Sequence, residues 1–93
     1  MGVQARAGEV FDITVEELGT AGYQWSVEAL PPGVTLVGER PEAPPAGAPP
    51  GSAGQRVFSL RADQPGLYEI VLISKRAWES QPATRRTVKV EVR

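Results

Sequence analysis

Most of this chain alternates between apolar and polar residues with a period of two, and glycine or proline interrupts the alternation at short intervals. Residues 11–16 read Phe-Asp-Ile-Thr-Val-Glu, and residues 88–92 read Val-Lys-Val-Glu-Val. Successive side chains of a strand point to opposite faces, so this pattern predicts strands with one buried face. No stretch has the period of an amphipathic helix. The sequence therefore predicts an all-β protein.

Seven short strands account for the apolar positions, and they are expected near residues 3–6, 11–16, 23–29, 34–39, 57–62, 67–73 and 88–92. Residues 67–73 are almost continuously apolar, which predicts a central strand covered on both faces. Seven strands without a helix predict an immunoglobulin-like antiparallel β-sandwich, with the whole chain 1–93 as one domain. We expect Trp25 in the centre of its core and Tyr23 in the core as well.

Charge and apolar content exclude two kinds of partner. The chain has 10 Lys and Arg against 11 Asp and Glu, a net charge of -1, so no global field attracts nucleic acid. The longest apolar run, residues 70–73, is far shorter than the roughly eighteen residues of a spanning helix, so we expect no membrane partner. Residues 1–6 lack the pattern of a signal peptide. The protein is thus either cytoplasmic, or periplasmic or secreted after removal of a signal.

Catalysis is not expected, because the chain contains no His and no Cys. It cannot form a Ser-His-Asp triad, a cysteine nucleophile, or a thiolate or imidazole metal site. Adjacent carboxyls at Glu16 and Glu17 point to opposite faces of a strand, as do Ser74 and Lys75, and we interpret all four as solvated or edge residues. The sequence therefore predicts neither an enzyme nor a cofactor.

Three segments do not fit the alternation. Residues 18–22 form a turn bracketed by Gly19 and Gly22, which reach positive φ without steric cost. Residues 40–54 contain five prolines and three glycines, which exclude a central strand and leave either a functional or a disordered loop. Residues 76–84 carry Trp78 outside the alternating runs. Two interpretations of Trp78 stay open, an exposed binding anchor or a ring folded over the core edge.

The strand directions place these three segments together. If successive strands run antiparallel, the connections at 18–22, 40–54 and 76–84 all emerge at one end of the sandwich. The other end carries short turns at 7–8, 31–33 and 63–66. An asymmetry of this kind is typical of a binding site presented by loops on a rigid scaffold.

The three segments also carry recognisable motifs. Residues 20–25 read Thr-Ala-Gly-Tyr-Gln-Trp, residues 51–54 read Gly-Ser-Ala-Gly, and residues 76–78 read Arg-Ala-Trp. In order and spacing they resemble the three inhibitory loops of the chagasin-like inhibitors of papain-family cysteine proteases. The framework is similar too, including Gly8-Glu9, Phe58 and the turn from Pro65 to Tyr68, so the resemblance covers nearly the whole chain.

Five positions depart from the family pattern. Leu18-Gly19 replaces the usual Asn-Pro, Ala21 replaces a threonine, Ala53 replaces a glycine, and Ala77 replaces a proline. Loss of the prolines should loosen the first and third loops. A more flexible loop loses more conformational entropy on binding, so these replacements are expected to affect affinity rather than family membership.

The resemblance implies reversible, competitive inhibition without covalent chemistry, by a monomer whose partner is a papain-family cysteine protease. The tip at Thr20 would lie over the catalytic cysteine, residues 51–54 would follow the unprimed side of the cleft, and Trp78 would bind on the primed side. The protease-binding residues implied are Gly19, Thr20, Ala21, Gly22, Gly51, Ser52, Ala53, Gly54, Arg76, Ala77 and Trp78.

Two alternatives belong to other classes. The first is a structural or adhesion module from a larger bacterial surface protein, for which Trp78 would be buried and the three loops would not act together. The second is a sugar-binding sandwich, which needs Trp78 and Tyr23 on one exposed face, although the strand pattern places Tyr23 inward.

Overall fold

A computed structural model describes residues 2–17 and 22–93 of this chain. This part of the chain contains seven strands and no helix, and hence no helix long enough to cross a membrane. The strands are β1 (Gly2–Ala5), β2 (Val10–Glu17), β3 (Tyr23–Ala29), β4 (Val34–Glu42), β5 (Gly54–Ala62), β6 (Gly66–Arg76) and β7 (Thr84–Val92).

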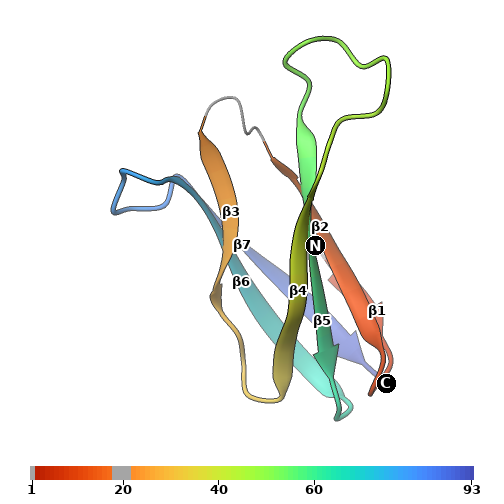
Figure 1. The fold of residues 1–93 in the computed structure, drawn as a ribbon. Helices are drawn as coiled ribbons and strands as arrows, with labels where there is room; N and C mark the ends of the chain where they lie inside the picture. Colours follow the sequence, from red (N-terminus) through yellow and green to blue (C-terminus); the bar gives the residue numbers. More distant parts are fainter. Residues whose placement is uncertain (1, 18–21) are drawn as a thin grey trace.

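The strands form two facing sheets (Figure 1). One has four strands in the order β1-β7-β6-β3, and the other has three in the order β2-β5-β4. Neighbours pair antiparallel except β1 and β7, which are parallel because both are odd members of a chain that reverses at every connection. The prediction of an immunoglobulin-like all-β sandwich is confirmed, with this one parallel pair added.

Inward-facing side chains of both sheets form one apolar core. Phe58 and Leu60 of β5 face Ile70 and Leu72 of β6, and all four have no exposed surface. Trp25 is only 6% exposed and belongs to the same cluster, as expected. The prediction for Tyr23 is wrong: its ring is half-buried and lies outside the core cluster, because Tyr23 begins β3 at the very end of the sandwich.

The prediction that residues 67–73 are covered on both faces is also wrong. Within the sheet β6 lies between β7 and β3, but a two-layer sandwich has no third layer over its outer face. Leu67 is 83% exposed there, and Val71 and Ile73 are half-buried. An ion pair from Arg85 on β7 to Glu28 on β3, with 2.8 Å between Nη2 and Oε2, crosses β6 on this side. Paired charges on the flanking strands thus replace a covering layer.

Tyr68 closes the end of the sandwich that carries the short turns. Its hydroxyl donates a hydrogen bond to the carbonyl of Gln64 at 2.8 Å. A Cβ added at Gly33 or Gly66 would lie 3.6 Å from its ring, so both turns pack against it. A tyrosine at the start of the sixth strand that binds backbone upstream is the tyrosine corner of immunoglobulin-like sandwiches.

Candidate functional site: three loops at one end

Three connections emerge at the same end of the sandwich, called here the loop end, and the others emerge at the opposite turn end (Figure 1). The first loop comprises residues 18–22, the second residues 43–53 and the third residues 77–83. The predicted site residues Gly19, Thr20 and Ala21 lie outside the described residues. The remaining predicted site residues are described, and all of them lie at or beside the loop end.

Arg76 holds the third loop against the start of β3. Its guanidinium carbon lies 4.4 Å from the centre of the Tyr23 ring and 5.6 Å from the centre of the Trp78 ring. The Glu79 amide donates to the Arg76 carbonyl at 3.0 Å, which closes a tight turn around Trp78. The Trp78 ring is 73% exposed, so the interpretation that it folds over the core edge is wrong. A cation between two rings contributes about 0.5 to 1 kcal/mol for each exposed contact.

Gly22 brings the first loop into contact with the third. Its φ is 82°, a conformation that side chains with a Cβ rarely adopt. A Cβ added there would also lie 3.2 Å from Cη2 of Trp78, closer than ordinary van der Waals contact. Glycine at this position therefore permits both the turn and the close approach of the exposed indole.

The second loop consists of two successive tight turns. The Ala48 amide donates to the Pro45 carbonyl at 3.1 Å, and the Ser52 amide donates to the Pro49 carbonyl at 3.2 Å. The third residue of each turn is a glycine with positive φ, 85° at Gly47 and 81° at Gly51, as a type II turn requires. The proline-rich composition thus encodes defined turns.

The second loop is shorter than the irregular segment expected at 40–54. β4 continues to Glu42 and includes Pro41, which is tolerated because β4 is an edge strand of its sheet. Gly54 already belongs to β5, and a Cβ added there would lie 2.6 Å from the Glu42 carbonyl oxygen. Gly54 therefore serves the close approach of β4 and β5, while Gly51, Ser52 and Ala53 remain in the loop.

Trp25 ties together the two strands that flank the first loop. Its backbone amide donates to Oε2 of Glu17 at 3.0 Å, and its indole Nε1–H donates to the Glu16 carbonyl at 2.7 Å. β2 and β3 belong to different sheets, so these hydrogen bonds cross the sandwich. They fix the separation of the strand ends between which residues 18–21 run.

Glu17 is paired with Arg56 inside the loop end of the sandwich. Arg56 donates from Nε at 2.7 Å and from Nη2 at 3.1 Å to the two carboxylate oxygens, and the side chains are only 11% and 12% exposed. Glu17 lies on the edge strand β2, but its interpretation as a solvated residue is wrong, because it continues the inward phase of Ile13 and Val15. The same interpretation fails for Ser74, which is 7% exposed.

Burial alone raises the pKa of the Glu17 carboxyl. The hydrogen bonds from Arg56 and from the Trp25 amide, together with the charge of Arg56, have the larger combined effect, so the pKa of Glu17 lies below its ordinary value. The hydrogen bond to Glu17 in turn raises the pKa of Arg56. The pair is therefore fully charged at neutral pH, and each partner compensates the burial of the other.

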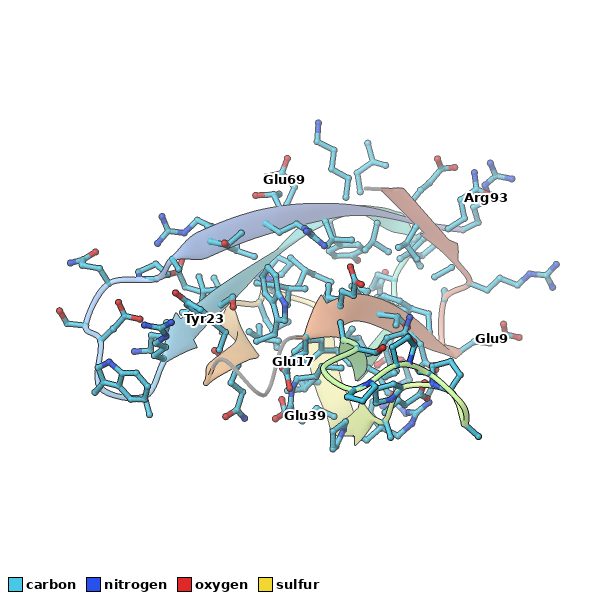
Figure 2. All side chains as sticks on the ribbon, turned by 90° about the horizontal axis from the view of Figure 1, so that it is seen from above. Glu9, Glu17, Tyr23, Glu39, Glu69 and Arg93 are labelled. Atoms are coloured by element: carbon cyan, nitrogen blue, oxygen red, sulfur yellow. The ribbon has the colours of Figure 1, made fainter. Side chains whose placement is uncertain are left out.

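Glu39, Arg56 and Arg86 are charged residues at the loop end that the sequence interpretation missed. Oε1 of Glu39 lies 3.6 Å from Nη1 of Arg56, and the Arg86 guanidinium carbon lies 5.2 Å from the centre of the Trp25 ring. Figure 2 looks down on this end, where Glu17 and Glu39 lie close together. Arg56 and Arg86 alternate in phase with the inward apolar residues of their own strands. This spacing is the feature of the sequence that could have identified them as inward-facing.

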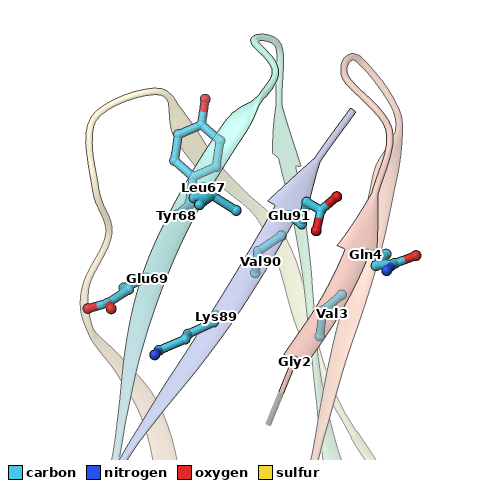
Figure 3. A pocket seen from close by; sticks show the side chains of 9 residues that line it. All are labelled: Gly2, Val3, Gln4, Leu67, Tyr68, Glu69, Lys89, Val90 and Glu91. Atoms are coloured by element: carbon cyan, nitrogen blue, oxygen red, sulfur yellow. The ribbon is translucent and has the colours of Figure 1, made fainter.

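Two shallow grooves differ in their relation to the loops. A groove of about 400 Å³ lies between the second and third loops, and its lining includes Ala53, Ala83 and, at the start of β3, Tyr23. A second groove, of about 700 Å³, lies where β1, β7 and β6 run side by side, near Leu67 and Lys89 and away from the loops (Figure 3).

Within the described residues, no three Asp or Glu side chains are placed to hold a metal ion.

A rigid sandwich that presents three loops at one end has the architecture of a loop-based binding protein. Comparison with known families gives a match between residues 4–92 and the chagasin family peptidase inhibitor I42. The chain therefore belongs to the chagasin family of peptidase inhibitors, as its motifs predicted. It is an inhibitor of peptidases and not an enzyme.

Solved structures support the same fold. The crystal structure of the cysteine protease inhibitor EhICP2 from Entamoeba histolytica matches with a TM-score of 0.74 and 22% identity, over 99% of this chain and 85% of that chain. The solution structure of amebosin matches with a TM-score of 0.71 and 28% identity, over 99% of this chain and 88% of that chain. A search of curated protein sequences gave no significant match.

Proposed function

We propose that this chain is a reversible, competitive inhibitor of papain-family cysteine proteases and that its three loops enter the active-site cleft together. Family membership supports peptidase inhibition, and the description of EhICP2 as a cysteine protease inhibitor supports the class of target. The observation that carries the proposal is the exposed Trp78, held between Arg76 and Gly22 beside the other loops at one end of the sandwich.

The first loop is the central element of the proposed interface. Gly19, Thr20, Ala21 and Gly22 wedge over the catalytic cysteine of the protease and are not bound in the cleft as a substrate. Thr20 provides the central polar contact. The hydrogen bonds of Trp25 to Glu16 and Glu17 support this role, because they hold both ends of the loop in place.

The other two loops extend the contact on either side. Residues 51–54 follow the unprimed side, where backbone groups of the second loop pair with the extended substrate-binding edge. Trp78 packs on the primed side, and Ala77 lies beside it at the exposed tip. Arg76 steadies Trp78 through the ring contact already described. A large exposed indole suits this role, because it offers much contact area for few rotatable bonds.

The mechanism needs no covalent step and no cofactor. The inhibitor occupies the cleft, excludes the substrate and dissociates unchanged. The whole chain 1–93 acts as one domain and as a monomer, so one inhibitor blocks one protease. Its affinity reflects how well the loops are organised before binding, because every residue ordered on binding costs conformational entropy.

Enzyme kinetics test the proposal. Papain and a cathepsin-L-like protease are assayed on a small peptide substrate at several inhibitor concentrations, with a serine protease as the matched negative control. We expect the apparent KM of the cysteine proteases to rise while kcat stays constant, with Ki between nanomolar and low micromolar and the chain left uncut. No inhibition by folded protein at tens of micromolar, or cleavage of the chain, would contradict the proposal.

A further inference from the structure

A continuous set of contacts, made by side chains and by the backbone amide of Trp25, joins strand ends of all three loops beneath the loop end. Its members are Glu39, Arg56, Glu17, Trp25 and Arg86, called here the stem network. It links both strands that flank the first loop, both strands that flank the second loop and the strand that follows the third loop.

The network runs across the sandwich in four steps. Glu39 of β4 approaches Arg56 of β5 at 3.6 Å, and Arg56 forms its two hydrogen bonds with Glu17 of β2. Glu17 accepts the amide hydrogen bond of Trp25 in the facing sheet, and the Trp25 ring lies under Arg86 of β7 at 5.2 Å. The ends of β4, β5, β2, β3 and β7 are thus coupled, each to the next.

The chemistry of these contacts makes them directional. A guanidinium that donates two parallel hydrogen bonds to a carboxylate fixes both distance and orientation, whereas apolar contacts tolerate sliding. The Arg56–Glu17 pair is nearly buried, so moving either strand would leave a poorly solvated charge without its partner. Such a pair is weak evidence for stability and stronger evidence for a defined arrangement.

We propose that the five residues of the stem network are positioning residues, which set the three loops at the mutual distances that the protease cleft requires. This inference rests on the function proposed above. None of the five need touch the protease, because each acts through the strand that carries a loop. A preorganised set of loops loses less entropy on binding, so the network raises affinity without adding contacts.

The test compares two variants that differ in where they act. Glu17→Gln keeps the size of the side chain and an acceptor for the Trp25 amide, but it removes the charge that orients Arg56. Val90→Ala is the matched control, since it destabilises the core at a buried position outside the network. Ki for papain is measured well below the unfolding temperature of both variants, where global stability no longer affects the folded fraction.

We expect Ki to rise about tenfold in Glu17→Gln and to stay unchanged in Val90→Ala. Arg56→Lys, which keeps the charge but loses the two-pronged hydrogen bond, should give a Ki between those of wild type and of Arg56→Met. An unchanged Ki in Glu17→Gln would overturn the inference. An equal rise in Val90→Ala would also overturn it, because the effect would then follow stability alone.

Nuclear magnetic resonance separates this inference from the proposed function. In Glu17→Gln, the amide signals of Ser52 in the second loop and Glu79 in the third should both shift, while Val90→Ala leaves them in place. Unmoved signals would overturn the positioning role even if wild type inhibits. A wild type that inhibits no papain-family protease would refute the proposed function, and the shifts would still decide whether the network positions the loops.

Discussion

At the turn end of the sandwich, Tyr68 packs against two glycine turns and its hydroxyl binds the backbone at Gln64. At the loop end, the inward positions are occupied instead by Glu17, Arg56 and the indole of Trp25. One end is closed by a ring and short turns, and the other by a nearly buried ion pair beneath three longer loops. The two ends of the same sandwich are thus stabilised differently, by ring packing against short turns at one end and by a charged pair at the other.

The difference shows how one scaffold can be compact at one end and present a surface at the other. Apolar packing suffices where strands are joined by short turns, because the turns themselves limit strand movement. Longer loops leave their stems less constrained, since loop closure alone does not fix orientation. Directional hydrogen bonds between charged groups supply that constraint at the loop end.

The largest expected effect on stability is the loss of Arg56 at the loop end. Arg56→Met would leave Glu17 nearly buried without its cation, and we expect the free energy of unfolding to fall by about 3 kcal/mol. Urea denaturation followed by tryptophan fluorescence measures this change. Arg85→Met, which breaks a similar but exposed pair with Glu28, is the matched control and should cost much less. Equal losses of stability in the two variants would contradict the expected difference between a nearly buried and an exposed ion pair.

The next effect concerns binding rather than stability. Trp78→Ala should raise Ki by about 30-fold, or roughly 2 kcal/mol, because the indole is the exposed anchor of the third loop. Its melting temperature should hardly change, since the ring is 73% exposed. Leu67→Ala is the control, with an even more exposed apolar side chain on the outer face of β6. A large loss of stability in Trp78→Ala, or an equal rise of Ki in Leu67→Ala, would contradict the assignment.

A smaller effect is expected at the turn end. Tyr68→Phe removes the hydrogen bond to Gln64 while keeping the ring, so the free energy of unfolding should fall by about 1 kcal/mol. Ki should be the same as that of wild type, because the change lies at the end opposite to the loops. Thermal unfolding and inhibition assays on the same sample measure both quantities. A raised Ki would show that the two ends are coupled.

The smallest effect is the dependence of stability on pH. The pKa of Glu17 is lowered on folding, so its contribution is present above its ordinary value of 4.5 and is lost as the pH falls through the lower value of the folded protein. The melting temperature should therefore fall below about pH 4.5, more steeply in wild type than in Glu17→Gln. Parallel curves for the two proteins would exclude Glu17 as a source of the acid sensitivity.

Sequence alone predicted the parts of this fold that follow from local periodicity. Alternation placed β2 and β7, and the reversal of direction at each connection placed the three loops at one end. The prediction for the run from Leu67 to Ile73 was wrong because apolar content does not reveal whether another layer covers the outer face of the sheet. Glu28 and Arg85, which border this face, lie 57 residues apart, and their pairing depends on the order of strands in the sheet.

The stem network could not be predicted from the sequence either, because its contacts depend on which strands are neighbours. Glu17 and Arg56 are 39 residues apart, and only the pairing of β2 with β5 brings them together. The alternation in the sequence places both residues on the inward face. A charged residue at such a position is, however, equally consistent with a strand end that is exposed to solvent. The exposure of Trp78 could not be predicted either, because it depends on the contacts of Arg76 and Gly22 across two loops.

The most direct test of the account is a crystal structure of the complex between this protein and papain whose catalytic cysteine has been blocked by a small alkyl group. The account predicts that residues of all three loops, including Thr20, Ser52 and Trp78, contact the active-site cleft, while the stem network stays free of the protease and unchanged. A complex formed through a sheet face or the turn end, or through one loop alone, would contradict it.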